Sequence, residues 1–374
     1  MTDERFSLKD HLFNRERVSY LGGLLERGIP GFDRSSFESE VLGRLPPLEL
    51  KQRIDMIAEV LVSFLDDDFA IAADQIRASL PPPLDPTLSD NDFGEFILIA
   101  LGKFVEDNGG EQYETSMRLL REITMRVSME GPVRRFIEDR PDQTLELFAD
   151  WAGDENYHVR RLVSESTRPR LPWARRIHID IERPLPLLDI LHADRTRYVT
   201  RSVANHLNDM AKVRPEIVIE TLRRWHELGW QHPTELRWMT RHALRTLIKQ
   251  GHQPAFALLG YADAPNVAVE LSLQTKTVRP GGALEFAVTL TAGSDQRLLI
   301  DYVLDFVASR GAVRSKVFKL RELSVAGGEI TTLEKRHPLR SDATTYRLYS
   351  GTHRLAVVAN GREVATDSFE VVVD

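Results

Sequence analysis

The residues of this chain best suited to chemistry lie in one short basic segment, residues 157–178. If the segment begins as a helix, His158, Arg161 and Glu165 fall at i, i+3 and i+7 and share one stripe. The loop that follows is stiffened by two prolines and carries Trp173. The segment contains one acid, Glu165, and six arginines: Arg160, Arg161, Arg168, Arg170, Arg175 and Arg176.

Glu165 is the unusual member of this segment. Neighbouring cations should lower the pKa of its carboxyl group and keep it ionised. An anion in a basic groove is a poor phosphate contact, but it can stabilise positive charge that develops on a substrate, or orient a water. The other interpretation is that Glu165 only forms an ion pair with Arg161 or Arg168.

An internal repeat predicts the scaffold that positions these residues. Arg161, Arg201 and Arg241 follow one another at intervals of 40 residues, each preceded at the third position by an aromatic ring. A period near 40 in helix-forming sequence is typical of HEAT-type helical repeats. Equivalent positions lie in register in such a stack, so the three arginines should form a row suited to following a polyanion.

Composition excludes several classes of site. The chain has 374 residues, a net charge of −7 and no cysteine, which excludes disulfides, thiolate metal sites and thiol catalysis. Neither a membrane-spanning run nor a signal peptide is visible, so we expect no membrane partner and a cytoplasmic protein. The sequence lacks HExxH and phosphate-binding glycine motifs, so we expect no metal, no nucleotide and no other cofactor. Ser164 and Ser166 near His158 are poor candidates for a nucleophile among so many arginines.

The charge is unevenly distributed. Residues 1–100 carry 19 acidic and 10 basic side chains, a net of −9, so the rest of the chain holds −7 − (−9) = +2. Residues 157–178 alone hold +5. A phosphate backbone senses such a local basic stripe more than the net charge of the whole chain.

Two kinds of periodicity predict two kinds of domain. Helical patterns follow one another through residues 1–262, which predicts an all-α HEAT-like-repeat solenoid. Residues 265–374 alternate apolar and polar positions, with Asn360-Gly361 as a type I′ hairpin signal. This pattern predicts an all-β immunoglobulin-like sandwich, without the Cys…Trp…Cys core of antibody domains. The predicted fold class is therefore multidomain.

Three stretches carry a resemblance to a known family. They are residues 157–173, the string SVANHLND at 202–209 and the string RLYSGTHRL at 347–355. Together they resemble the AlkC branch of the HEAT-like-repeat DNA alkylation-repair glycosylases. The resemblance extends from about residue 110 to the end, and the order of helical repeats and immunoglobulin-like module is also similar.

The resemblance implies a monofunctional glycosylase. It would hydrolyse the N-glycosidic bond of cationic N-alkylated bases, such as 3-methyladenine and 3-methylcytosine, in double-stranded DNA without extruding the base. A cationic base is already a good leaving group, so the enzyme needs ionised carboxylates beside an oxocarbenium-like sugar and a positioned water. We expect it to act as a monomer.

The resemblance also implies the site residues. Catalytic roles would fall to Glu130, Glu165, Asp209 and Trp173. Glu130 precedes Gly131-Pro132, a pair that departs from the sequence pattern of the family. Glu130 could instead be only a charge at a helix N-terminus. Asp209 could instead tie adjacent repeats together, and Trp173 could be a core anchor. The DNA-binding candidates, in the repeats and in the β domain, are His158, Arg160, Arg161, Arg168, Arg170, Arg201, Arg241, Arg347 and Arg354.

Two other interpretations stay open. HEAT solenoids often bind proteins, so the chain could be a non-catalytic scaffold for DNA or for an acidic protein partner. It could also be a relative of the repair enzymes that binds DNA without activity, and the departure at Gly131-Pro132 leaves room for that interpretation.

Overall fold

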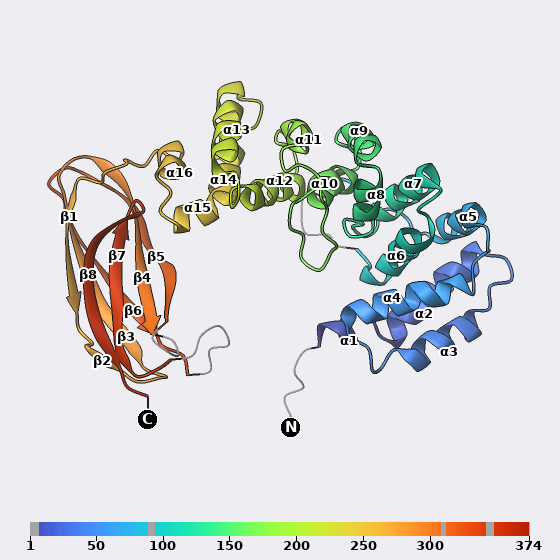
Figure 1. The fold of residues 1–374 in the computed structure, drawn as a ribbon, viewed down its shortest axis with the longest axis horizontal. Helices are drawn as coiled ribbons and strands as arrows, with labels where there is room; N and C mark the ends of the chain where they lie inside the picture. The colour runs from blue at the N-terminus through green and yellow to red at the C-terminus, as the bar shows by residue number, and fades with distance from the viewer. Residues whose placement is uncertain (1–6, 89–93, 308–311, 342–347, 374) are drawn as a thin grey trace. The chain divides into compact units, whose positions relative to one another are not determined.

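A computed structural model of the protein describes residues 7–88, 94–307, 312–341 and 348–373. It has helices followed by strands, which confirms the predicted order of an all-α part and an all-β part (Figure 1). The chain divides into two compact units, residues 1–210 with 228–239 and residues 211–227 with 240–374. The second unit thus contains helices as well as the strands. The predicted domain boundary at 262–265 stays a prediction.

The helices run in this order: α1 (Leu8–Leu12), α2 (Arg15–Gly28), α3 (Arg34–Arg44), α4 (Leu50–Val62), α5 (Phe69–Ser79), the short 3₁₀ helix Phe96–Leu98, α6 (Ile99–Asn108), α7 (Tyr113–Thr124), α8 (Val133–Asp139), α9 (Pro141–Trp151), α10 (Tyr157–Ser166), α11 (Leu185–Leu191), α12 (Arg197–Met210), α13 (Pro215–Leu228), α14 (Pro233–Ala243), α15 (Arg245–Lys249) and α16 (Gln253–Leu258).

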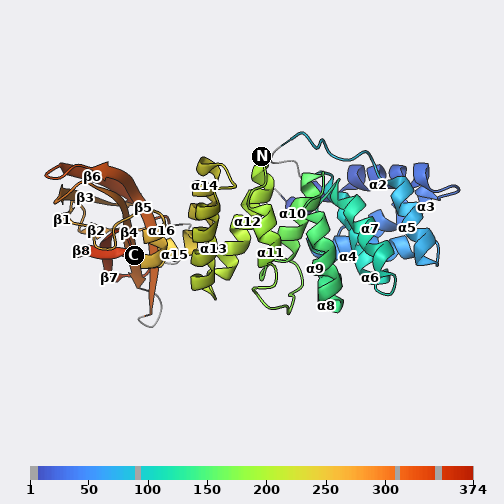
Figure 2. The ribbon, with the colours of Figure 1, turned by 90° about the horizontal axis from the view of Figure 1, so that it is seen from above.

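The repeat of 40 residues coincides with helices. Its three frames fall on α10, α12 and α14. In the first unit α10 packs against α12, as Figure 2 shows, and α4 packs against α6. The aromatic residues of the first two frames meet where α10 packs on α12, since the rings of His158 and Tyr198 lie 5.3 Å apart edge to face. The repeat therefore reflects one helix pair per period.

The strands are β1 (Val267–Leu273), β2 (Thr277–Val278), β3 (Ala283–Ala292), β4 (Gln296–Val307), β5 (Val313–Val325), β6 (Ile330–Pro338), β7 (Gly351–Ala359) and β8 (Arg362–Val371). They form two sheets, ordered β1-β3-β6 and β2-β8-β7-β4-β5. Among the strands of the described residues, only β2 and β8 pair in parallel. Alternating residues of both sheets, among them Phe286, Tyr302 and Phe369, are buried in one core. This arrangement is an immunoglobulin-like sandwich.

The hairpin between β7 and β8 confirms the predicted turn. Asn360 and Gly361 form its two-residue loop with φ of 47° and 79°. Both values lie in the left-handed region that a type I′ turn requires. The Asn360 side chain is buried and its Oδ1 accepts a hydrogen bond from the backbone N–H of Leu299 at 2.9 Å. Asn360 therefore has two roles: its backbone adopts the positive φ that the turn requires, and its side chain holds β4.

No helix among the described residues is both long and apolar enough to cross a bilayer.

Candidate active site

Helices α10 and α12 carry most of the predicted site. Helix α10 begins at Asn156, whose Oδ1 accepts from the backbone N–H of His158 at 2.9 Å. Arg161 and Glu165 lie one turn apart on α10 and therefore on the same face. Asp209 lies near the end of α12, the helix that packs on α10. Glu130 comes from the segment between α7 and α8.

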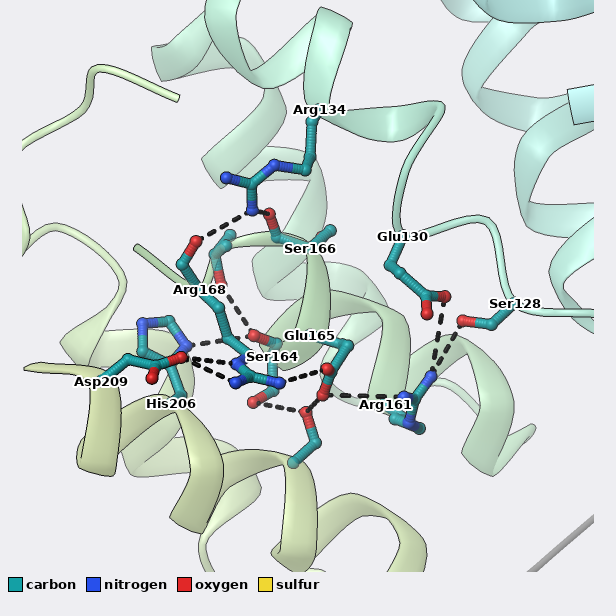
Figure 3. Close-up of polar contacts among 12 residues, drawn as sticks. Ser128, Glu130, Arg134, Arg161, Ser164, Glu165, Ser166, Arg168, His206 and Asp209 are labelled. Atoms are coloured by element: carbon teal, nitrogen blue, oxygen red, sulfur yellow. Dashed lines mark hydrogen bonds and ion pairs between the residues drawn. The ribbon is translucent and has the colours of Figure 1, made fainter. Parts of the chain in front are cut away.

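These residues form a chain of alternating charges, which we call the carboxylate cluster: Glu130, Arg161, Glu165, Arg168 and Asp209 (Figure 3). Arg161 lies between two carboxylates, with its guanidinium 3.7 Å from Glu130 and 3.6 Å from Glu165. Arg168 donates to Glu165 Oε1 at 2.5 Å and to Asp209 Oδ2 at 2.7 and 2.9 Å. The structure thus brings together the three acids that the sequence singled out. Arg161 and Arg168 lie between these acids, with side chains 14% and 12% exposed.

Glu165 is the central carboxylate of the cluster, and its side chain is 7% exposed. Burial alone would raise the pKa of Glu165, but the charges of Arg161 and Arg168 and hydrogen bonds from Ser202 and Arg168 hold that pKa below its usual value. The Ser202 hydroxyl donates to Glu165 Oε2 at 2.7 Å. Glu165 is therefore ionised near neutral pH, as expected from its neighbours.

Glu130 is the open end of the cluster. Its side chain is 27% exposed, against 5% for Asp209. Its Oε2 is buried and has no hydrogen-bond partner among the described residues, although the guanidinium of Arg161 lies 3.7 Å away. Buried polar atoms are rarely left without a hydrogen bond, so this oxygen has capacity for a ligand or a water.

Arg161 is fixed from several sides. It donates to the Ser128 hydroxyl at 2.9 Å, and its guanidinium lies 4.6 Å from the centre of the Tyr198 ring. Burial would lower the pKa of Arg161, but Glu130 and Glu165 raise it above its usual value. Burial also raises the pKa of the Tyr198 phenol, to about 12. Arg161 therefore stays charged, and Tyr198 stays neutral beneath it.

Arg134 of α8 holds the loop of the candidate site, and the sequence did not indicate this residue. Its side chain is fully buried and donates to the backbone carbonyls of Ser166 and Arg168, each at 2.8 Å (Figure 3). It also donates to the backbone carbonyl of Arg175 at 2.6 Å. Those carbonyls flank the loop that carries Arg168 and Trp173, so Arg134 fastens that loop to the helix. Burial lowers the pKa of Arg134 to about 10. Nothing in the spacing of the sequence distinguishes Arg134 from its neighbour Arg135.

Two further side chains of α12, Ser202 and His206, lie in the string 202–209, but the sequence did not single out either residue. Ser202 holds Glu165 as described above. The Nδ1 of His206 lies 3.0 Å from the carbonyl of Ser164, so Nδ1 carries the proton and donates. Burial lowers the pKa of His206 to about 4. His206 is therefore neutral at pH 7 and part of the wall behind Asp209.

Trp173 is not a core anchor. The residue is 71% exposed and its φ is 66°, which is uncommon for any residue except glycine. It lines a pocket together with Gly131 and Pro132, the two residues that follow Glu130. The indole is thus available to an incoming molecule.

His158 and Arg160 lie inside the protein. The His158 ring is buried against Tyr157, with ring centres 4.1 Å apart. Arg160 is also buried, forms an ion pair with Asp194 at 2.5 Å and donates to the carbonyl of Asp154 at 2.8 Å. Burial argues against a phosphate contact by His158, and the guanidinium of Arg160 is used to hold α10 in the stack.

Arg241 is held within the second unit. Its guanidinium lies 2.7 Å from the Glu322 carboxylate of β5, which also accepts from Tyr261, Arg297 and Lys319. Burial would raise the pKa of Glu322, but hydrogen bonds from these donors, Arg241 first, hold it far below its usual value. Arg241, which belongs to the same compact unit as β5, is therefore held by Glu322.

The other DNA-binding candidates differ in exposure. Arg170 is exposed, and no acidic group of the described residues lies within ion-pair distance of it. Arg201 is half-buried on α12. Arg354 lies within β7, not at a turn, and its guanidinium is 2.9 Å from Asp305. Arg347 falls outside the described residues.

The described part of the chain contains no group of three or more metal-binding side chains of the His, Cys, Asp and Glu types.

Comparisons with known proteins agree with this architecture. A family model described as DNA alkylation repair enzyme matches residues 90–247, and a model of the C-terminal Ig-like domain of the uncharacterised protein YhaZ matches residues 267–373. Uncharacterized protein YhaZ of Bacillus subtilis (strain 168) is 32% identical over 365 residues, 96% of this chain and 98% of that protein. A solved structure, Pseudomonas fluorescens alkylpurine DNA glycosylase AlkC bound to DNA containing an abasic site analog, is 32% identical. It matches 98% of this chain and 100% of that one with a TM-score of 0.86.

Proposed function

Because this chain belongs to the AlkC-type family of DNA alkylation-repair glycosylases, we propose that it removes cationic N-alkylated bases from duplex DNA. The substrates are bases with a formal positive charge, such as 3-methyladenine and 3-methylcytosine. We propose that the protein acts as a monomer in the cytoplasm and leaves the damaged base in the duplex during cleavage. The DNA in the solved relative supports a DNA partner for this chain.

The reaction is a hydrolysis at the sugar carbon C1′. The bond from C1′ to the base nitrogen breaks, and its electron pair neutralises the cationic base. The sugar then carries positive charge, water adds to C1′, and the proton of that water is lost to solvent. The chemical need is therefore negative charge and a positioned water beside the sugar, not a proton donor for the base.

The carboxylate cluster carries this proposal. Three carboxylates and two guanidinium groups give it a net charge of −3 + 2 = −1, so it presents negative charge inside a basic segment. A preorganised charge of this kind stabilises a developing cation without the cost of rearranging solvent. The arginines align the acids, and their charges keep Glu165 ionised.

The division of roles follows from exposure. Glu130 is the most exposed acid and has an oxygen with spare hydrogen-bonding capacity, so we assign it to the sugar or to the attacking water. Glu165 and Asp209 are nearly fully buried, and we assign them to the charge of the site and to the placement of Arg161 and Arg168. Trp173, exposed on its loop, would pack against the sugar and backbone of the lesion.

DNA binding would also use arginines of the site loop and of α12. Arg170 is exposed on the loop and Arg201 is half-buried on α12, and both would contact phosphates. We propose that the β domain adds backbone contacts through its basic residues, including Arg347 and Arg354. Phosphate contacts give affinity and register but no base selection.

The second candidate is a DNA-binding scaffold without catalysis. One observation favours it: both oxygens of Glu165 are already engaged by protein groups. Incubation of the protein with methylated duplex DNA in the presence of EDTA separates the two. Release of methylated bases, detected by chromatography, supports the glycosylase, and DNA binding without release supports the scaffold.

A further inference from the structure

The loop that carries Trp173 is held on α8 at a second point, which no step of the proposed hydrolysis uses. Residues 167–184 join α10 to α11 and form neither a helix nor a strand (Figure 1). Arg134 holds the first part of this loop, as described above. Glu138, one turn further along α8, holds the loop at His178. Positions i and i+4 of a helix share one face, so one face of α8 supports the loop twice.

Glu138 accepts two hydrogen bonds from His178. The backbone N–H of His178 donates to Oε2 at 2.7 Å, and its ring Nδ1 donates to Oε1 at 2.8 Å. These bonds hold the pKa of the Glu138 carboxyl group below its usual value, so the acceptor is ionised near neutral pH. A carboxylate that accepts from a backbone N–H fixes the main chain and not only a side chain. The contact therefore defines where residue 178 lies on α8.

Trp173 needs such support from outside its own turn. Its φ is 66°, a conformation that persists in a tryptophan only where the surroundings hold it. The residue is 71% exposed, so contacts of its own side chain supply little of that hold. A backbone hydrogen bond from Ala174 to the carbonyl of Leu171 closes the turn, but at 3.4 Å it is longer than an ordinary hydrogen bond. The path of the chain through residue 173 therefore depends on the attachments of the loop to α8.

Another attachment of the loop provides a comparison. Arg183, near the end of the loop, forms an ion pair with Asp142 of α9 at 2.5 Å. The Asp142 side chain is 92% exposed, and an ion pair so exposed to solvent adds little stability. Along the chain, Arg183 also lies farther from Trp173 than His178 does. Asp142 therefore offers a matched control for Glu138.

We propose that Glu138 is a positioning residue of this glycosylase: it holds His178 so that the loop presents Trp173 to the sugar and backbone of the lesion. The inference rests on the proposed function, which gives Trp173 its role. Glu138 makes no contact with the carboxylate cluster in the described structure, so it acts through the loop. Loss of Glu138 should slow excision and leave the charge of the cluster unchanged.

The first measurement reports the position of Trp173 without any DNA. The full chain is labelled with fluorinated tryptophan, and the fluorine NMR resonance of Trp173 is assigned with Trp173→Phe. We expect Glu138→Ala to shift or broaden this resonance and to leave the resonances of the other tryptophans unchanged. We expect Asp142→Asn to leave all of them as in the wild type. An unmoved Trp173 resonance in Glu138→Ala would overturn the proposal.

The second measurement connects that position to excision. In single turnover, Glu138→Ala should release 3-methyladenine from duplex DNA at least about 10-fold more slowly than the wild type, because misplaced groups lose rate steeply. Asp142→Asn and Glu138→Gln should excise at nearly the wild-type rate, since the amide oxygen of glutamine still accepts the backbone N–H of His178. In a Trp173→Ala background, Glu138→Ala should slow excision no further. An equal further loss in that background would show that Glu138 acts without Trp173, and the proposal would fail.

The two measurements separate this inference from the proposed function. If the wild type releases no methylated base, the glycosylase function fails, and the Trp173 resonance still tests the hold by Glu138. If the wild type excises bases and Glu138→Ala excises them equally fast, only this inference fails. The urea midpoint of Glu138→Ala should match that of Asp142→Asn. A lower midpoint would show that Glu138 supports the unit as a whole, which also overturns the proposal.

Discussion

Glu165 and Asp209, on neighbouring helices, share the guanidinium of Arg168, which donates to Glu165 Oε1 at 2.5 Å and to Asp209 Oδ2 at 2.7 and 2.9 Å. This arrangement links the helix pair to the charge of the site. It also places an arginine from the most basic part of the chain between two acids. The stability of the first unit and the proposed chemistry should therefore both depend on Glu165, Arg168 and Asp209.

Substitution of Glu165 should separate binding from chemistry. Glu165→Gln keeps the shape of the site but removes one of three negative charges, so we expect duplex binding to persist and excision to fall about 100-fold. The measurement is single-turnover release of methylated base, with binding measured in parallel. Unchanged excision would remove Glu165 from the mechanism.

Loss of Arg168 should destabilise the first unit. Arg168→Met leaves Glu165 and Asp209 buried without this partner, which costs about 3–5 kcal/mol for a broken buried pair. Urea unfolding measures this loss. Arg170→Met is the control, because Arg170 is exposed on the same loop and should change stability by less than about 0.5 kcal/mol. Equal stability of the two variants would contradict the bridging role.

Arg134 should control the loop that carries Trp173. Arg134→Lys cannot reach all three carbonyls, so we expect trypsin to cleave the loop after Arg170 or Arg176 faster than in the wild type. Arg135→Lys is the matched control on the same helix, because Arg135 makes no contact with that loop in the described structure. Identical cleavage rates in the two variants would show that Arg134 does not hold the loop.

His206 should give the protein a specific dependence on pH. Its folded pKa of about 4 lies below the unfolded value of 6.5, so the unfolded state takes up the proton first as pH falls. The stability linked to His206 is therefore complete above pH 6.5. It is lost progressively towards pH 4, by up to about 3 kcal/mol. Unfolding free energies of the wild type and His206→Gln across this window test the effect. Parallel curves would contradict it.

The salt dependence of DNA binding should report the phosphate contacts proposed for Arg170 and Arg201. Neutralising Arg170 and Arg201 together should reduce the slope of log K against log salt by about 2, close to one unit for each lost phosphate contact. The same pair of substitutions at Arg160 and Arg241 would mainly lower stability, since both guanidinium groups are paired with acids. An unchanged slope in the first pair would exclude those phosphate contacts.

Much of the fold follows from local patterns in the sequence. The frames around Arg161, Arg201 and Arg241 mark α10, α12 and α14 because one period equals one helix pair. Asn360-Gly361 marks its hairpin because few other residue pairs accept two positive φ values. Glu165 stands out because it is the single acid among six arginines.

The partners of the arginines could not be predicted from those patterns. Arg168 meets Asp209 across 41 residues, and Arg241 meets Glu322 across 81. Such pairs depend on which helix faces which neighbour. An arginine near a predicted groove is suited equally to a phosphate and to a buried carboxylate. The exposure of Trp173 and the role of Arg134 likewise depend on the path of a loop that has no periodicity.

The most direct test of the central claim is single-turnover excision of 3-methyladenine from duplex DNA by Glu130→Gln. Glu130 is the exposed end of the carboxylate cluster, so we predict that excision falls about 100-fold while duplex affinity stays within a few-fold of the wild type. Glu114→Gln, on an exposed position of α7, should behave as the wild type. Excision by Glu130→Gln at the rate of Glu114→Gln would contradict catalysis by the cluster.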